Sequence, residues 1–354
     1  MKKKIFLGIL ICLWACQEQA PEIVVKKGNL ALPEQHDYPV QLSDWRLFKT
    51  PIKNLIAAES VIPYELASPL FTDYAQKSRF IKLPKDSVAL YNKEEVLDFP
   101  IGTIIIKNFY YTEAQIGEHR ILETRLLVHE EEAWKALSYV WNEEQTDAKR
   151  TLSGASIPLK LIQGEGELKE FSYSVPNEVQ CKSCHEYKGK MSPIGPKARQ
   201  LNHKMAYGFE LQNQLEYWHE KGLLSDWPGL ANSPSMVNYH DPSQNLNLRA
   251  RAYLDINCAH CHRREGPAKN SGLYLTYLEA DPYKLGFNKP PVAAGRGSGG
   301  MKYALVKGQP EQSILYHRMA SLDPGVMMPE LGRKLNHEEG LALIADWIKQ
   351  SKEI

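Results

Sequence analysis

The stretch Gly102-Thr103-Ile104-Ile105-Ile106-Lys107-Asn108-Phe109-Tyr110-Tyr111 decides the fold of the N-terminal half of the chain. It is dense in β-branched and aromatic residues, which favour a strand. Similar runs occur on either side of it, and turn residues separate them at short intervals, at residues 80–83, 121–129 and 134–141. We therefore expect residues 37–175 to form an antiparallel β-sandwich-like domain.

The pattern of apolar residues changes from strand to helix after residue 175. Apolar side chains recur there at helical spacing, in residues 211–222, 248–256 and 336–348. Asn336 and Glu339 form a capping-box pattern at the start of the last helix. The sequence thus predicts an α+β multidomain chain, in which two mainly α-helical domains, residues 176–246 and 247–354, follow the β-rich domain.

Residues 1–15 have the anatomy of a secretion signal. Three lysines precede an apolar run that is too short to span a bilayer. The segment ends in Leu13-Trp14-Ala15-Cys16, which is typical of a bacterial lipobox, so we expect Cys16 to be lipidated and to become the mature N-terminus. The alternative is a plain secretory signal with a nearby cysteine. Residues 16–36 are polar and contain two prolines, which predicts a lipid-anchored tether.

The charge of the chain gives no sign of a nucleic-acid partner. The formal net charge is +1, from 43 basic and 42 acidic residues. Three of the positive charges fall in the predicted signal, and no basic stripe remains to bind nucleic acid or anionic lipid. We expect no nucleic acid among the partners, and membrane association through the lipid anchor.

Four of the six cysteines form two Cys-x-x-Cys-His motifs, Cys181-Lys182-Ser183-Cys184-His185 and Cys258-Ala259-His260-Cys261-His262. Two thiols at this spacing add to the two vinyl groups of one haem, and the adjacent histidine coordinates the iron. We therefore expect two covalent haem c groups, haem 1 at the first motif and haem 2 at the second. His185 and His262 are the predicted proximal ligands, and His260 is expected to be only a spacer.

Other readings of the two cysteine pairs fit less well. A Cys₄ zinc site does not require a histidine directly after each pair, and the two pairs lie far apart for a small zinc ribbon. A redox dithiol needs only one pair. Disulfides are common outside the cytoplasm, yet each of these cysteines has a better assignment. Export also favours haem, since c-type attachment takes place outside the cytoplasm.

The sequence Met327-Met328-Pro329 offers a candidate for the sixth ligand of haem 2. It lies well after His262 and just before the terminal helix, and a thioether ligand raises the haem potential. We predict Met328 as this ligand, with Met327 as the alternate. The other reading is two core methionines, since Met is a common gap-filler. A carbonyl near Gly266-Pro267 is expected to accept the proton of the proximal imidazole.

The distal ligand of haem 1 is less determined by the sequence. Met236 suits a compact cytochrome and is the candidate we name. A carbonyl at Gly195-Pro196 is expected to accept the imidazole proton of His185. Met191 follows His185 too closely in the chain to reach over the haem. An open haem 1 is the competing hypothesis, and other ligand candidates are Met205, His203, His219, His240, Met319 and Met327.

Several strings of the chain, taken together, carry a family resemblance; they lie at residues 123–127, 139–142, 145–148, 181–185, 194–199, 257–262, 292–295 and 327–333. With these strings the chain resembles a family of bacterial exported dihaem c-type cytochromes. Members are conserved hypothetical proteins, and some are encoded beside a parallel β-helix repeat protein. The resemblance implies haem binding, export and a β-rich N-terminal domain, but it supplies no substrate.

These observations predict an electron-transfer protein of the bacterial cell envelope, in the periplasm or on the cell surface. Its partner would be another cytochrome or a dehydrogenase. One rival is an enzyme, a dihaem peroxidase or oxidase that uses an open haem 1. A second rival is a partner- or glycan-binding lipoprotein that serves an attached dehydrogenase.

Overall fold

The computed structural model describes residues 38–163 and 166–351. The predicted signal at 1–15, the tether at 16–36 and the lipidation site Cys16 lie outside the described residues. Among the helices of the described part, none is long and apolar enough to cross a membrane.

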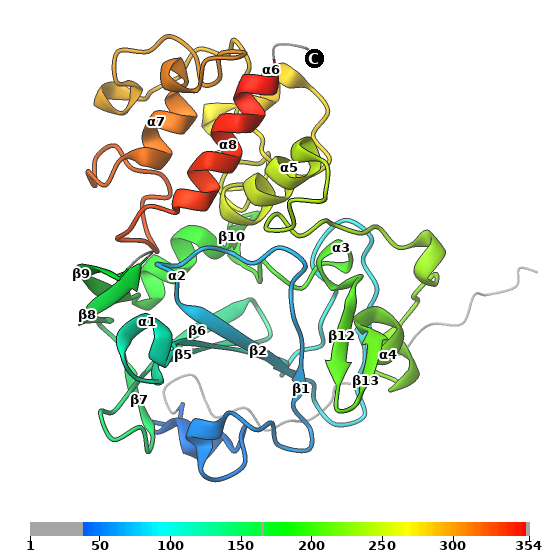
Figure 1. The fold of residues 1–354 in the computed structure, drawn as a ribbon. Helices are drawn as coiled ribbons and strands as arrows, with labels where there is room; N and C mark the ends of the chain where they lie inside the picture. The colour runs from blue at the N-terminus through cyan, green and yellow to red at the C-terminus, as the bar shows by residue number, and fades with distance from the viewer. Residues whose placement is uncertain (1–37, 164–165, 352–354) are drawn as a thin grey trace, which may run out of the picture.

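A six-stranded antiparallel sheet forms the centre of the N-terminal half, with strand order β1-β2-β4-β5-β6-β7 (Figure 1). The four strands predicted from the sequence all lie in this sheet, which confirms them. Its strands are β1 (Ile62–Pro63), β2 (Gln76–Lys82), β4 (Ile104–Tyr111), β5 (Arg120–His129), β6 (Trp134–Trp141) and β7 (Ala148–Thr151).

Both faces of strand β4 are covered, which explains its nearly continuous apolar sequence. Ile104 and Ile106 point to one face, where they pack with residues from the 38–61 segment. Ile105 and Phe109 point to the other face, where residues from later in the chain cover them. Because side chains alternate along a strand, Lys107 lies on this second face as well.

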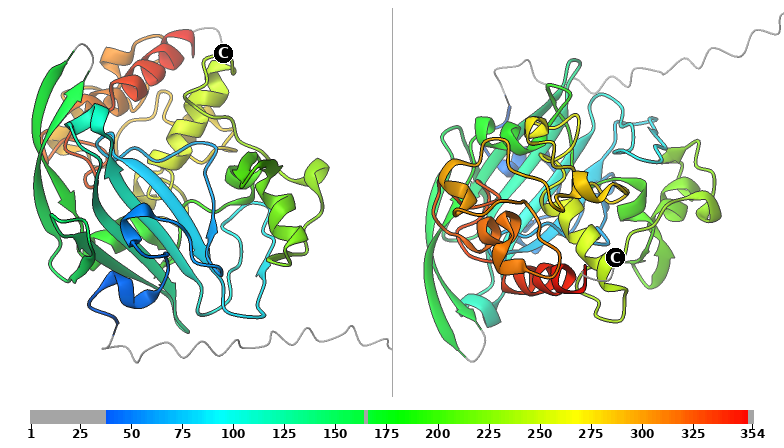
Figure 2. Two further views of the ribbon diagram at one scale, coloured as in Figure 1. Left: turned by 60° about the horizontal axis from the view of Figure 1, so that its bottom comes forward. Right: turned by 90° about the horizontal axis from the view of Figure 1, so that it is seen from above.

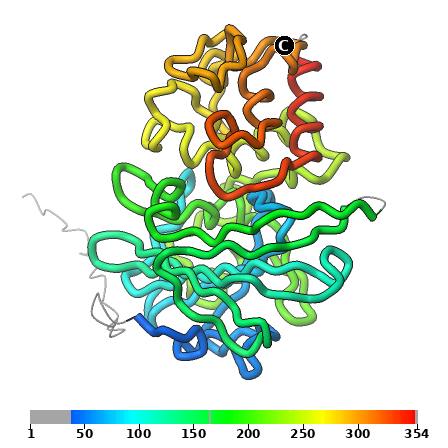
Figure 3. The backbone as a smooth tube through the Cα atoms, turned by 90° about the vertical axis from the view of Figure 1, so that its left-hand side faces the viewer, coloured from blue at the N-terminus to red at the C-terminus, as the bar shows by residue number. Residues whose placement is uncertain are grey.

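The remaining strands form four small pairs. The long hairpin β8 (Ala155–Gln163) and β9 (Glu167–Val175) packs on the second face through Leu159, Leu161 and Tyr173. Figure 3 shows this hairpin as two long green strands. The other pairs are β3 (Ala89–Leu90) with β14 (Leu224–Ser225), β10 (Glu186–Tyr187) with β11 (Lys190–Met191), and β12 (Lys204–Tyr207) with β13 (Glu210–Asn213).

The helices are mostly short, and the longer ones gather at the C-terminal end, above the sheet in Figure 1. The α-helices are α1 (Glu113–Ile116), α2 (Glu178–His185), α3 (Ala198–Leu201), α4 (Gln214–Glu220), α5 (Leu246–Asn257), α6 (Pro282–Leu285), α7 (Ile314–Ala320) and α8 (Glu338–Gln350). Short 3₁₀ turns cover Leu42–Trp45, Ile52–Asn54, Leu230–Asn232, Lys269–Ser271, Gly295–Ser298 and Pro310–Gln312.

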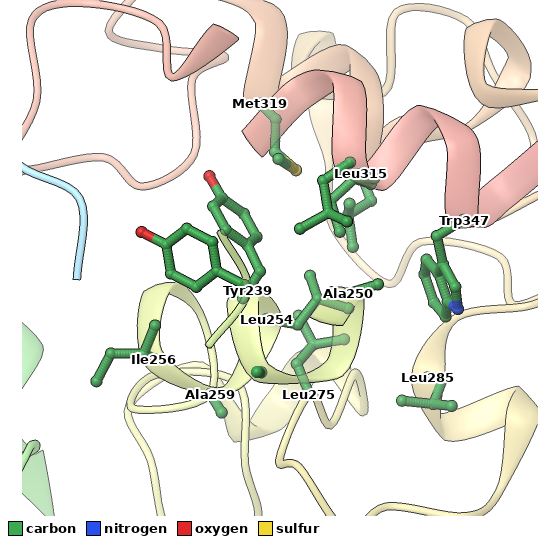
Figure 4. Close-up of a cluster of buried hydrophobic side chains, with 14 of the residues drawn as sticks. Tyr239, Ala250, Leu254, Ile256, Ala259, Leu275, Leu285, Leu315, Met319 and Trp347 are labelled. Carbon is green, nitrogen blue, oxygen red and sulfur yellow. The ribbon is translucent and has the colours of Figure 1, made fainter. Parts of the chain in front are cut away.

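Helices α5 and α8 share one apolar core, shown in Figure 4. Leu254 of α5 and Ile344 of α8 are fully buried in it, and Leu315 of α7 joins them. Both helices were predicted. The expected cap at Asn336 is wrong, since His337 is the N-cap and the Asn336 amide donates instead to the carbonyl of Ala320.

The predicted fold class is wrong. The β-rich part is a large single sheet with an added hairpin, and two mainly helical cytochrome domains are not found in the described residues. Residues 176–246 hold only three short helices among small strand pairs, and their apolar side chains pack onto the sheet with Ile81 and Ile105. Leu211, counted as helical, lies in β13 and is exposed, because short apolar runs fit either period.

The 258–337 segment between α5 and α8 also departs from a mainly helical domain. It contains the short helices α6 and α7, and loops and 3₁₀ turns fill most of the rest. Figure 2 shows these loops beside α7 and α8. The sequence pattern located the two long helices but overestimated the helical content between them.

The contact between α5 and α8 yields a stability prediction. A Cβ added at Gly340 would lie 2.5 Å from the hydroxyl oxygen of Tyr253. We expect Gly340→Val to lower the free energy of unfolding by about 1–3 kcal/mol, as overpacking does. Urea denaturation of the variant and the wild type measures this change in the free energy of unfolding. Ala342→Val, at an exposed position of the same helix, should change stability by less than about 0.5 kcal/mol; equal effects would contradict the close packing.

Candidate functional site

The first cysteine motif occupies helix α2, which lies against strand β6. The Asn177 side chain accepts a hydrogen bond from the Gln180 backbone amide at 2.9 Å, and the Gln180 side-chain oxygen accepts one from the Asn177 backbone amide at 3.0 Å, so a capping box starts the helix. Cys181 is buried beside Ala136 of β6. One helical turn then places Cys184 and His185 at the C-terminal end of α2.

A backbone carbonyl fixes the ring of His185. Its Nδ1 lies 2.9 Å from the Ser192 carbonyl oxygen, and the Ser192 amide donates back to the His185 carbonyl at 2.7 Å. The carbonyl can only accept, so Nδ1 carries the proton and Nε2 keeps a free lone pair. The acceptor expected at Gly195-Pro196 is therefore wrong.

The second motif begins where helix α5 ends. Cys258 is the C-cap, and the His262 amide donates to the Cys258 carbonyl at 2.9 Å, which closes a tight turn. A Cβ at Gly266 would lie 2.4 Å from the Cys261 carbonyl oxygen, so only glycine fits where this loop passes the motif.

A serine hydroxyl fixes the ring of His262. Ser271 Oγ donates to the Ala268 carbonyl at 2.7 Å and lies 3.3 Å from His262 Nδ1. With its own proton used, Ser271 Oγ accepts from Nδ1, and Nε2 of His262 is left as a lone pair. The acceptor predicted at Gly266-Pro267 is thus replaced by Ser271.

The two motifs, far apart in the chain, meet in space. The ligand atoms of Cys184, His260 and Cys261 all lie within 4.8 Å of one another. The Cys261 thiol donates to the Ser183 carbonyl oxygen at 3.7 Å, and the closeness of the two sulfurs lowers the pKa of Cys184 and raises that of Cys261. His260, which was expected to be only a spacer, therefore lies at the point where the two motifs meet, called the junction below. All four motif cysteines are free thiols.

Each of the two histidines predicted as proximal ligands lines a cavity. His262 lines one of about 600 Å³ together with Cys258 and Cys261. His185 lines a second and narrower cavity, about 190 Å³, between α2 and the sheet, together with Cys181 and Cys184. A third cavity beside Tyr187 and Phe99 adds about 530 Å³ on another side of Cys184 and His185.

Of the methionines considered as ligands, Met328 and Met319 reach these cavities. Each lines both the His262 cavity and the His185 cavity. Met327 is buried and lines neither. Met236 is buried in the core around α5 and lines none of the three cavities. Met191 packs beside Cys181 without lining them.

Burial keeps both imidazoles neutral. It lowers the pKa of His185 to about 4 and the pKa of His262 to about 4, in each case mainly by removing the ring from water. Burial also raises the pKa of Cys258 to about 12 and raises that of Cys181. At neutral pH each motif therefore offers a neutral imidazole with one fixed proton.

Sequence reasoning missed His260 as a member of the site and did not single out Met319 among the ligand candidates. A histidine inside the second motif was visible, but nothing in the sequence places it beside Cys184. Met319 was one of several possible haem 1 ligands, and only its position in α7 brings it to the cavities. Sequence reasoning also missed the side chains that the sheet contributes, notably Lys107 and Arg125.

Comparisons with known proteins return nothing that bears on this site. No family model, no curated protein and no solved structure matches the chain. The resemblance to exported dihaem cytochromes therefore stays a prediction from the quoted residues.

The capping box of α2 generates the prediction for this site. Asn177→Ala removes the side-chain acceptor at the helix start, and we expect a loss of about 1 kcal/mol in the free energy of unfolding. Chemical denaturation measures the loss. Asn177→Asp is the matched control, because aspartate caps as well as asparagine. Equal stability of the alanine variant and the wild type would show that α2 does not depend on this cap.

Proposed function

We propose that this chain is a dihaem c-type cytochrome that transfers electrons in the bacterial cell envelope. The observation that carries the proposal is the arrangement of the two motifs. Each has two free thiols, a neutral histidine with Nε2 unprotonated, and an adjoining cavity. This donor set fits a haem held by two thioethers and one axial imidazole. When bound, each haem supplies a reversible Fe(II)/Fe(III) couple.

The residues of the chain have distinct tasks in this proposal. Cys181, Cys184, Cys258 and Cys261 would attach the two haems. His185 and His262 would coordinate the irons, and their Nδ1 partners, the Ser192 carbonyl and the Ser271 hydroxyl, would hold the rings in the required tautomer. Met328 would be the sixth ligand of haem 2, since it lines the His262 cavity.

The junction of the motifs supports electron transfer rather than two independent sites. The sulfurs of Cys184 and Cys261 lie within 4.8 Å of each other. Haems attached through these two cysteines would therefore be neighbours, which favours a relay between them. The envelope location is proposed from the signal and lipobox of residues 1–16 alone.

A metal ion at Cys184, His260 and Cys261 is the second candidate, favoured by the closeness of their ligand atoms. A structural zinc site needs four ligands. Cys181 and Cys258 are not part of this cluster, and neither are the fixed imidazoles of His185 and His262. The zinc reading leaves these four side chains and their cavities unused, so haem is the better account.

Haem content tests the proposal directly. We expect two covalent haems in the wild type, one in Cys181→Ala/Cys184→Ala and one in Cys258→Ala/Cys261→Ala, because each pair attaches its own group. Haem absorbance per chain under denaturing alkaline conditions gives the count. Ser183→Ala, inside the first motif, should keep two. A wild type without covalent haem would overturn the proposal and favour the metal site.

Substitution of the methionines tests the axial ligand of haem 2. Met328→Ala should abolish the weak far-red absorption of methionine-ligated ferric haem and lower one midpoint potential, because a thioether stabilises Fe(II). Spectroelectrochemistry measures both. Met327→Ala, at the neighbouring buried residue, should retain the band. Loss of the band in Met319→Ala instead would assign the ligand to α7.

A further inference from the structure

The cavity beside His185 is lined on one side by a row of cations from the sheet. Arg79 of β2 pairs with Lys107 of β4, and Lys107 pairs with Arg125 of β5, so the three side chains lie across adjacent strands. All three line this cavity. Like charges directly opposite one another on adjacent strands repel, so this row is unfavourable without a compensating anion.

Within residues 38–163 and 166–351, two of these cations lack an anionic partner. Arg125 pairs with Glu123, whose carboxylate also accepts the Tyr173 hydroxyl at 2.6 Å. Among the described residues, Arg79 and Lys107 have no carboxylate at ion-pair distance. Arg79 is 8% exposed, and its Nη2 has no hydrogen-bond partner.

The described residues that line the cavity contribute no negative charge to balance them. Its lining includes Arg333 as a fourth cation, and none of the described acidic residues lines it. The Arg333 guanidinium donates hydrogen bonds to backbone carbonyls, among them those of Ser321 and Met319. Burial and the neighbouring arginines lower the pKa of Lys107, which indicates how poorly the isolated chain accommodates this charge. A buried cation without a partner costs free energy that a bound anion recovers.

The direction of the row fits a haem attached at α2. Cys181 packs against Ala136 of β6. Starting from β6, the next strands of the sheet are β5, β4 and β2, which hold Arg125, Lys107 and Arg79 in that order. With strands about 4.8 Å apart, Lys107 lies two strands and Arg79 three strands from β6, or about 10 and 14 Å. In haem, the propionates stand on the edge opposite the vinyl groups, so they point away from the attaching cysteines.

We propose that Arg79 and Lys107 form a carboxylate-binding site that holds the propionates of the haem attached to Cys181 and Cys184. This inference rests on the proposed function and assigns the sheet a task in it. Charge-assisted hydrogen bonds from a guanidinium suit a carboxylate. A free small carboxylate in the same cavity is the other source of this chemistry, and the experiment separates the two.

The test uses the purified holoprotein with Arg79→Gln, Lys107→Gln and, as the matched control, Arg120→Gln. Arg120 begins the same strand as Arg125 and pairs with Glu118 at 3.8 Å. We expect both cavity variants to keep two haems, to lower the midpoint potential of one haem only, and to shift its propionate bending band in resonance Raman spectra. Removal of a nearby positive charge stabilises Fe(III). Arg120→Gln should change neither measurement.

Further outcomes separate the alternatives. Arg79→Lys keeps the positive charge, so the haem midpoint potentials of this variant should stay near those of the wild type. This variant also replaces Arg79→Gln in the test if Arg79→Gln fails to fold. Acetate added to the wild type at constant ionic strength should have no saturable effect; a saturable spectral change that Arg79→Gln abolishes would assign the row to a free anion. Two haems with unchanged potentials and propionate bands would overturn this inference alone. Absence of covalent haem would overturn the proposed function and this inference together.

Discussion

The packing of the end of α2 against the turn that follows α5 is the contact on which the proposed site depends. It brings Cys184, His260 and Cys261 together and opens one cavity beside each motif. Two ion pairs near the second motif and α5 stabilise this arrangement. Arg263, one residue after the second motif, pairs with Glu95. Burial alone would raise the pKa of the Glu95 carboxyl, but the neighbouring cations, Arg263 first among them, lower it. The buried Arg199–Asp255 pair at 3.3 Å ties α3 to α5, and breaking such a pair typically costs about 3–5 kcal/mol.

The sheet supports the site from the other side. The sequence of residues 102–111 was sufficient to predict a strand, because its β-branched and aromatic residues fit a pleated surface buried on both faces. The helices α5 and α8 were predictable for a similar reason, since their apolar residues recur at one period over three turns. The two histidines of the motifs were predicted as haem ligands from their spacing after the cysteines, and the structure places each of them beside a cavity.

The parts that could not be predicted are those that depend on long-range pairing. The alternation along β4 implies that Lys107 faces away from Ile106, but only the strand order places it between Arg79 and Arg125. Leu211 was assigned to a helix and lies in β13, because a few apolar residues satisfy either period. Met236 was named as the candidate ligand of haem 1 because of its distance from His185 along the chain. That distance could not show that Met236 is buried in the α5 core.

The measurement that tests the central claim most directly is the anomalous scattering of crystals of the purified protein, recorded at the iron and zinc edges. The account predicts two iron peaks per chain, one beside His185 and one beside His262, and no zinc at Cys184, His260 and Cys261. A single zinc peak among those three residues, with no iron, would contradict it.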